Sequence, residues 1–367
     1  MISIEQAKLE VVAEFPKGYF LENLAIRADG SILVSAMNKS ELWYIPAPAS
    51  SLPIKPVLVH TFDLMTLNIV ETAEEDVFYL TASNVYTTRV SHLYRLDFRG
   101  WEPGDTLRPE LLLEFPEPKV GMNGSCLVAP NVLLAAGATS LIWRVDLPTD
   151  GTPASARVWM EHDNMKMRPG EKKPEQPGVN GIRYAARSGY LYYTSTSQQL
   201  MMRVPVNQET LEPAGLPEFV AGGRYWDDFV LDEEAEIAYV TTHRENTIDH
   251  VLMRADGNRA GFTVAAGNPF TETLVGPSSG VWRRGPGDYG RVAYFTTDGG
   301  TAQSPDGVSR TAKLLRVTFP RVDVSDTNEA PGRCRSLGAS RGARCHQDTA
   351  AGFSAWAAFV RLKSCRL

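Results

Sequence analysis

The feature that most constrains this sequence is a pattern of two short β-type runs around a turn signal, which occurs six times. In the clearest copy, Tyr225–Thr242, acidic residues separate the apolar runs Phe229–Leu231 and Ile237–Val240. Such a pair of runs is typical of a β-hairpin. At intervals of 46, 55, 57, 47 and 51 residues, the copies begin at Glu22, Asn68, Asn123, Asn180, Asp227 and Ser278. A period near ~50 residues built only of short strands predicts the blades of a β-propeller.

Further strand-like runs complete each repeat. A third apolar run follows every hairpin, and a fourth follows most of them, as in Val57–Phe62 and Leu111–Phe115. Six units of about four strands predict an all-β, six-bladed propeller. The sixth unit has only three runs of its own, so we expect Leu9–Phe15 to add its fourth strand. Closing the ring in this way removes open sheet edges, and it assigns residues 1–320 to the propeller.

Charge and hydropathy exclude several classes of partner. The formal net charge is −6 and the sequence pI is about 5.6, so we expect no nucleic-acid partner. No apolar run approaches the ~18 residues of a membrane span, and the N-terminal segment lacks the basic and apolar regions of a signal peptide. We therefore expect a cytoplasmic protein. Cys126, the one cysteine inside the repeats, is expected to be a small buried hydrophobe.

Residues 321–367 form a C-terminal extension of different composition. From Ala330 onward it carries seven Lys/Arg residues against one acidic residue, and it holds three of the four cysteines, Cys334, Cys345 and Cys365. This composition is typical of a disordered tail. The alternative is a tail that folds back on the acidic body, with Gly352–Leu362 as an apolar docking segment.

Polar residues recur where each innermost strand is expected to start. Six such strands surround one axis, so these positions should converge at one mouth of the central channel. At a single position, an Asx or Ser residue would more simply shape a turn. The recurrence in all six repeats instead favours a binding site. Its candidate residues are Glu22, Asn23, Asn68, Met122, Asn123, Asn180, Trp226, Asp227, Ser278 and Ser279.

The walls of this site are expected to be apolar and aromatic. Flanking residues could provide them, namely Tyr19, Phe20, Met122, Tyr225, Trp226 and Trp282, although blade core is the competing interpretation of each. The long polar loop His162–Gly178 should overhang the mouth, with Met165 and Met167 closing over a ligand. Of the histidines, His162 ranks first as a candidate to reach a pocket, although a position outside the pocket is favoured even for it, and His243 is expected to face solvent.

The sequence resembles the SMP-30/gluconolactonase-like six-bladed propellers over roughly residues 9–320. In that family a divalent metal is held by a Glu of the first blade, an Asn of an N-G step and an Asp. Glu22 in FLENLAI, Asn180 in VNGIRYAA and Asp227 in DDFVLD match these positions, and Asn123 in MNGS is similar to a further Asn. The sequence departs from the family where Asn23 and Asp228 replace glycines. The resemblance implies a Ca²⁺ or Mg²⁺ site of oxygen ligands.

A fungal branch of these propellers is more similar still. The stretches FPKGYFLENLAIRADGSILVS, VAAGNPFTETLVGPSSGVW and VAYFTTDGG carry this likeness. The branch belongs to secondary-metabolite pathways and includes hetero-Diels–Alderases, which join a tropolone-derived ortho-quinone methide to a humulene-type sesquiterpene. The resemblance therefore implies a pericyclase that needs no metal, with polyketide-derived and terpene molecules as its substrates in meroterpenoid biosynthesis.

Three functions remain open on the sequence. A pericyclase would use Asp227, Glu22 and Asn180 as catalytic residues, with Asp227 or Glu22 as a general acid if burial keeps it protonated. Its substrates would contact Phe20, Asn23, Asn68, Met122, Asn123, Trp226, Ser278 and Ser279. A metal-dependent lactonase would instead use Glu22, Asn180 and Asp227 as metal ligands, with Asp228 or Asp232 as base. The third alternative is a propeller that binds a small molecule or a protein without catalysis.

Overall fold

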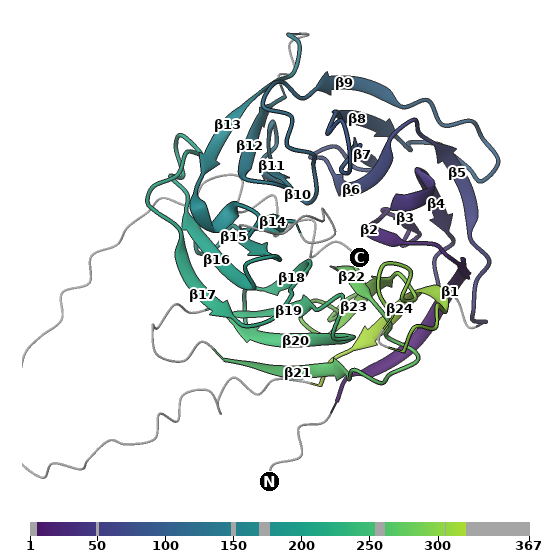
Figure 1. The fold of residues 1–367 in the computed structure, drawn as a ribbon. Helices are drawn as coiled ribbons and strands as arrows, with labels where there is room; N and C mark the ends of the chain where they lie inside the picture. The colour runs from purple at the N-terminus through teal and green to yellow at the C-terminus, as the bar shows by residue number, and fades with distance from the viewer. Residues whose placement is uncertain are drawn as a thin grey trace, which may run out of the picture. The chain divides into compact units, whose positions relative to one another are not determined.

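Each of the six repeats forms a four-stranded antiparallel sheet, as the sequence predicts. The computed structural model describes residues 6–48, 51–147, 152–168, 177–253, 261–304 and 306–320. In this part of the chain the six sheets form the blades of a propeller, with the first strand of each repeat at the centre (Figure 1). The C-terminal extension, with the two interpretations given to it, lies outside the described residues.

Blades 1 to 3 follow one another along the chain. Their strands, from the centre outward, are β2 (Leu21–Ile26), β3 (Ile32–Ala36), β4 (Glu41–Ile45) and β5 (Val57–Thr61); β6 (Met65–Glu71), β7 (Val77–Ser83), β8 (Ser91–Asp97) and β9 (Glu110–Glu114); β10 (Ser125–Ala129), β11 (Val132–Gly137), β12 (Leu141–Asp146) and β13 (Ser155–Glu161). A short 3₁₀ helix, η1 (Met37–Lys39), follows β3, and a second, η2 (Asp163–Met165), follows β13.

Blades 4 to 6 complete the ring. Their strands, in the same order, are β14 (Val179–Ala185), β15 (Tyr190–Ser195), β16 (Leu200–Pro205) and β17 (Glu218–Gly222); β18 (Phe229–Asp232), β19 (Ile237–Thr241), β20 (Thr247–Leu252) and β21 (Phe262–Gly267); β22 (Pro277–Trp282), β23 (Val292–Thr297), β24 (Thr311–Thr318) and β1 (Lys8–Lys17). Among the described residues, no helix is long and apolar enough to cross a membrane.

The N-terminal strand closes the ring, which confirms the sequence prediction. Strand β1 pairs antiparallel with β24, in a register that sets Lys8 opposite Thr318 and Phe15 opposite Ala312 (Figure 1). An ion pair between Glu10 and Arg316 joins the two strands. The outer edge of blade 6 is therefore covered by a segment from the other end of the propeller, as ring closure requires.

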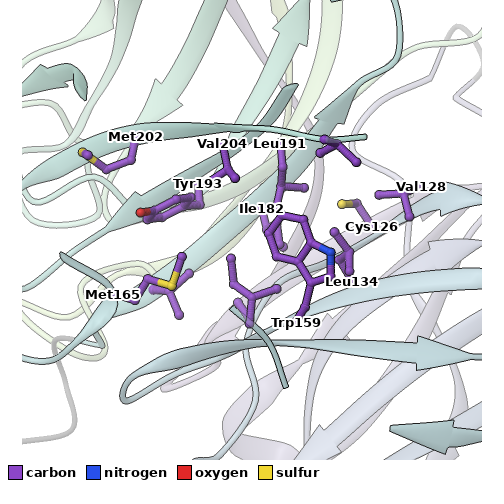
Figure 2. Packing of buried hydrophobic residues seen from close by; sticks show 14 of the residues in the cluster. Cys126, Val128, Leu134, Trp159, Met165, Ile182, Leu191, Tyr193, Met202 and Val204 are labelled. Atoms are coloured by element: carbon purple, nitrogen blue, oxygen red, sulfur yellow. The ribbon is translucent and has the colours of Figure 1, made fainter. Parts of the chain in front are cut away.

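Apolar side chains from neighbouring blades form the core. The innermost strand β2 and the second strands β3 and β11 are buried at every residue, because both faces of each blade pack on a neighbour. Between blades 3 and 4, Cys126 and Trp159 pack with Ile182 and Tyr193 (Figure 2). Burial raises the pKa of the Cys126 thiol to about 12, so this cysteine is the buried hydrophobe that we expected.

The inner strands share one irregularity that determines what faces the channel. Strands β2, β14 and β22 are each out of register with their neighbours across the pairs Glu22–Asn23, Asn180–Gly181 and Ser278–Ser279. The same geometry precedes β18, where the Asp227 amide donates to Thr241 O and the Thr241 amide donates to Asp228 O. Two residues opposite one residue form a β-bulge, which changes the direction of side chains. The bulge therefore brings successive polar residues toward the centre.

Hydroxyl groups on the second strand of the blades accept backbone N–H groups that the bulges leave without a strand partner. In five blades a Ser or Thr hydroxyl accepts the backbone N–H of the second bulge residue, at 2.9–3.3 Å. Several of these hydroxyls also donate to the next blade, as Ser35 does to Leu67 O (3.0 Å) and Thr241 does to Ser278 O (2.8 Å). The acceptor hydroxyls are Ser35, Thr81, Thr194, Thr241 and Thr296. They hold the strand starts at fixed positions around the channel.

Candidate functional site

A pocket opens where the innermost strands begin, and its empty volume, including space open to solvent, is about 670 Å³. Residues before or within the inner strands line it, together with residues that follow the second strands. Most of the apolar and aromatic lining residues belong to blades 1 to 3, namely Phe20, Met37, Leu67, Val85, Tyr86 and Ala138, while Pro177, Tyr225 and Ala302 belong to blades 4, 5 and 6. The polar side, mainly from blades 4 and 5, has Asn180, Thr196, Asp227, His243 and Arg244, while Glu22 and Asn123 come from blades 1 and 3. The pocket therefore has two chemically different sides.

Glu22 presents a carboxyl group to this pocket. Its side chain is 6% exposed, and it makes no hydrogen bond to any described residue. Desolvation by burial, together with the nearby carboxylates of Asp227, Asp228 and Asp298, raises the pKa of Glu22 well above its usual value. This environment favours the neutral form of the carboxyl group, which can donate a hydrogen bond to a ligand.

Asp227 lies on the same lining and is held by Asn180. The Asn180 amide nitrogen donates to Asp227 Oδ1 (2.6 Å) and to the Thr196 hydroxyl (2.9 Å). The Thr196 hydroxyl in turn donates to Trp226 O (2.7 Å), which fixes the orientation of the amide. Burial raises the pKa of Asp227 to about 7, although His243 and the Asn180 hydrogen bond oppose the rise. Asp227 can therefore give or accept a proton near neutral pH.

His243 also lines the pocket, contrary to our expectation that it faces solvent. It is nearly buried, its Nε2 lies 3.1 Å from Asp298 Oδ2, and its ring centroid is 5.1 Å from that of Phe20. Burial opposes protonation, but Asp298 and Asp227 outweigh it and raise the pKa of the imidazole. The signal that could have found His243 is its repeat position, because residues just after the second strand line the pocket in blades 1 to 5.

A second layer of polar residues follows the pocket residues along the inner strands. Asp228 Oδ2 accepts hydrogen bonds from Arg183 (2.5 Å), Ser279 (2.6 Å) and Asn23 (3.2 Å). The Asn23 amide also donates to the Ser279 hydroxyl (3.0 Å). These side chains belong to blades 1, 4, 5 and 6 and are outside the pocket lining. We expected Asn23 and Ser279 to contact substrate, but the structure shows them joining blades.

Four further candidates also lie outside the pocket lining. Met122 and Trp226 are fully buried in the core, because each precedes a lining residue and points to the opposite side of the chain. The Trp226 indole donates to Asp249 (2.9 Å). The Ser278 hydroxyl donates to Leu21 O (2.5 Å), and Asn68 accepts from Ser125. The sequence identified the correct strand starts, but it did not determine which of two adjacent residues faces the pocket.

The long loop before blade 4 contributes less to the pocket than expected. Pro177 lines it, whereas residues 169–176 lie outside the described part of the chain. Met165 is fully buried in the core between blades 3 and 4 (Figure 2), so the prediction that it closes over a ligand is wrong. His162 caps η2 by accepting from the Asn164 amide and does not line the pocket.

The residue types of this pocket fit a hard divalent cation. Glu22, Asp227 and Asn180 all line the pocket, and Asn180 Oδ1 makes no hydrogen bond to a described residue. Carboxylate and amide oxygens are ligands that Ca²⁺ and Mg²⁺ prefer. The set has two acidic residues, and within the described residues no group of three or more His, Cys, Asp or Glu side chains is arranged to hold a metal.

Comparison with known proteins relates the chain to propeller enzymes. A protein from Phoma sp. named "Putative hetero-Diels-Alderase" is 23% identical over 305 residues, which cover 74% of this chain and 81% of that protein. No family model matches the sequence.

Solved structures share the fold at low sequence identity. A luciferin-regenerating enzyme has a TM-score of 0.62 at 14% identity and covers 85% of this chain and 95% of its own. The calcium-binding protein regucalcin from Agrobacterium tumefaciens has a TM-score of 0.56 at 16% identity, covering 86% and 95%. A gluconolactonase from Xanthomonas campestris has a TM-score of 0.55 at 12% identity, covering 86% and 90%. These solved structures are similar to the chain in fold, as the resemblance to the SMP-30/gluconolactonase-like propellers predicted, and the Phoma protein is similar to it in sequence.

Proposed function

We propose that this protein is a fungal secondary-metabolism enzyme that joins a tropolone-derived ortho-quinone methide to a humulene-type sesquiterpene by a hetero-Diels–Alder reaction. The observation that carries the proposal is one pocket with an apolar side facing a side of protonatable carboxyl groups. The name of the Phoma relative supports the reaction class. A polyketide-derived molecule and a terpene are then the binding partners.

The apolar side suits the hydrocarbon reactant. In the reaction, the C=C–C=O unit of the quinone methide adds to one alkene of the terpene, so that a C–C and a C–O bond form and no atom is lost. Holding both reactants in a near-attack arrangement can supply about 7–11 kcal/mol of the barrier. Phe20, Met37 and Leu67 offer the terpene an apolar surface, while the opposite side orients the oxygen of the quinone methide.

The carboxyl side suits the oxygen that gains negative charge. Protonated Glu22 can donate a hydrogen bond to it, and one such donor is typically worth about 10²–10³ in rate. Glu22 can also protonate the leaving hydroxyl of a hydroxymethyl precursor. The C–O bond then breaks, water leaves, and the ring hydroxyl gives its proton to Asp227, which Asn180 holds in place. The substrate loses one water molecule and becomes the quinone methide, while one proton has passed from Glu22 to Asp227. Return of that proton to Glu22 restores the hydrogen-bond donor for the cycloaddition.

A metal-dependent lactonase is the second candidate, favoured by the free oxygen atoms of Glu22 and Asn180. Glu22, Asp227 and Asn180 would hold Ca²⁺ or Mg²⁺, which when bound polarises a carbonyl and activates water. The bases that we considered do not suit this role. Asp228 is paired with Arg183 behind the pocket, and Asp232 accepts the amides of Glu234 and Ala235 in the turn after β18.

Metal analysis combined with two activity assays separates these functions. Purified protein is analysed for bound metal and assayed, with and without EDTA, for tropolone–humulene coupling and for lactone hydrolysis. We expect coupling above the uncatalysed rate that EDTA does not change. Tightly bound Ca²⁺ or Mg²⁺, together with lactone hydrolysis that chelation abolishes, would replace the pericyclase with the lactonase. Inactivity in both assays would favour a propeller that binds a small molecule without catalysis.

A further inference from the structure

We propose that His243, held by Asp298, is a catalytic residue that donates a hydrogen bond from Nδ1 to the substrate oxygen on which negative charge develops. The inference rests on the proposed function and specifies its substrate class. That class is a conjugated carbonyl compound whose oxygen turns toward blades 5 and 6, with the hydrocarbon reactant against blades 1 to 3.

Asp298 is positioned as an acceptor for His243. It directly follows β23 and is fully buried. Its Oδ1 accepts the Gly300 amide (2.7 Å), and its Oδ2 accepts both the Ala302 amide (2.8 Å) and His243 Nε2 (3.1 Å). Gly276 must be glycine here, because its φ is +65° and a Cβ would lie 1.8 Å from Asp298 Oδ1. Two backbone donors thus aim the carboxylate at the imidazole.

The other ring nitrogen of His243 remains available to a ligand. Asp298 only accepts, so Nε2 carries a hydrogen. Nδ1 makes no hydrogen bond to any described residue, and the ring lines the pocket beside Phe20. The groups that influence its charge are Asp298 and Asp227, which favour the imidazolium, and Arg244, which opposes it. In the imidazolium form both ring nitrogens are donors, and Nδ1–H is the one that a ligand can reach.

A hydrogen bond of this kind favours one substrate class. In a hetero-Diels–Alder reaction of inverse electron demand, the alkene gives electron density to the heterodiene, and the carbonyl oxygen becomes more negative in the transition state. A charged donor strengthens its bond to that oxygen as the charge grows, and it accelerates the reaction because the bond is weaker in the ground state. A hydrocarbon gains nothing from the donor, so the two reactants are sorted between the two sides of the pocket.

The test compares two histidine variants and one aspartate variant. His243→Phe keeps a ring but removes the donor, and His250→Phe makes the same change on β20, away from the pocket lining. For tropolone–humulene coupling we expect kcat to fall about 10²-fold in His243→Phe, with KM nearly unchanged and with His250→Phe like wild type. Asp298→Asn should lower the pH at which activity declines. Wild-type kcat in folded His243→Phe would overturn the inference and leave the proposed function standing.

A second measurement uses wild-type protein and does not depend on turnover. Wild-type protein with ¹⁵N-labelled histidine is titrated with tropolone, a carbonyl probe, and the His243 nitrogen shifts are followed by NMR. We expect Nδ1 to shift on binding. Bound tropolone without an Nδ1 shift would contradict the inference. If wild type makes no coupled product, the proposed function fails. An Nδ1 shift would then still support His243 as a donor to carbonyl oxygen, and the absence of tropolone binding would overturn both proposals.

Discussion

Two adjacent layers of the channel use similar residues in opposite ways. In the pocket layer, the Glu22 side chain has no hydrogen-bond partner among the described residues, and Asp227 accepts a hydrogen bond from Asn180. In the second layer, the next residues of the same strands, Asn23 and Asp228, are bonded together with Ser279 across three blades. The difference shows that sequence neighbours separate into residues that line the pocket and residues that join the blades. The bulge is the reason, because it turns both residues toward the channel at different depths.

The largest expected effect is on the second layer. Replacing Asp228 with Ala leaves the Arg183 guanidinium without its carboxylate, so we expect the free energy of unfolding to fall by about 3–5 kcal/mol. Urea denaturation measures it. In the control, Asp146→Ala removes a partner of Arg144 at the protein surface, and a loss below about 1 kcal/mol is expected. Equal losses in the two variants would contradict a structural role for the second layer.

In the pocket layer, Asp227→Asn should stabilise the fold at alkaline pH. The pKa of Asp227 rises from 3.8 to about 7 on folding, so the native state holds this proton more tightly than the unfolded state. The resulting stability is complete below about pH 4 and is lost as pH rises through 7. Since Asn carries no charge, the variant should exceed wild type by up to about 4 kcal/mol at pH 8 and match it at pH 4. Denaturation at both pH values checks this, and a difference that does not change with pH would contradict it.

Glu22→Gln should separate activity from stability. The amide keeps the shape of the side chain but loses the acidic proton, so we expect tropolone–humulene coupling to slow by about 10²-fold, with stability retained. Steady-state kinetics and thermal unfolding measure the two quantities. Glu14→Gln, at an exposed position of β1, is the matched control and should change neither. Full activity in Glu22→Gln would move the acid role to another residue.

The smallest effect is expected at Ser279. Its hydroxyl donates to Asp228 and accepts from Asn23, so Ser279→Ala should lower the free energy of unfolding by about 1–2 kcal/mol and leave coupling activity unchanged. Urea denaturation measures the free energy of unfolding, and the coupling assay measures activity. A large loss of activity without a loss of stability would place Ser279 in the substrate site.

The fold could be predicted from the sequence because its information is local and repeated. Each hairpin can be recognised from two β-rich runs and a turn. The sixth repeat has only three runs, which predicts Leu9–Phe15 as its fourth strand, and this segment lies within β1. The pocket was harder to predict. Strand alternation would have separated Phe20 and Glu22 from Leu21, and Tyr225 and Asp227 from Trp226.

Two parts of the site depend on tertiary contacts and had no local signal. The bulges that direct Asn23 and Asp228 into the second layer arise from pairing with β3 and β19. His243 meets Asp298 only through the packing of blade 5 on blade 6, because 55 residues separate them in the chain. The sequence therefore predicted the end of the channel at which the pocket lies, while the environment of each ionisable side chain required the structure.

The enantiomeric excess of the coupled product tests the central claim most directly. An achiral quinone methide and an achiral humulene give a racemic adduct in solution, whereas a pocket with one apolar and one carboxyl side presents a single face of each reactant. We predict one dominant enantiomer with wild-type protein, and the same enantiomer at a lower rate with Glu22→Gln, because the pocket that orients the two reactants remains in the variant. A racemic product at the uncatalysed rate with folded wild-type protein would contradict the account.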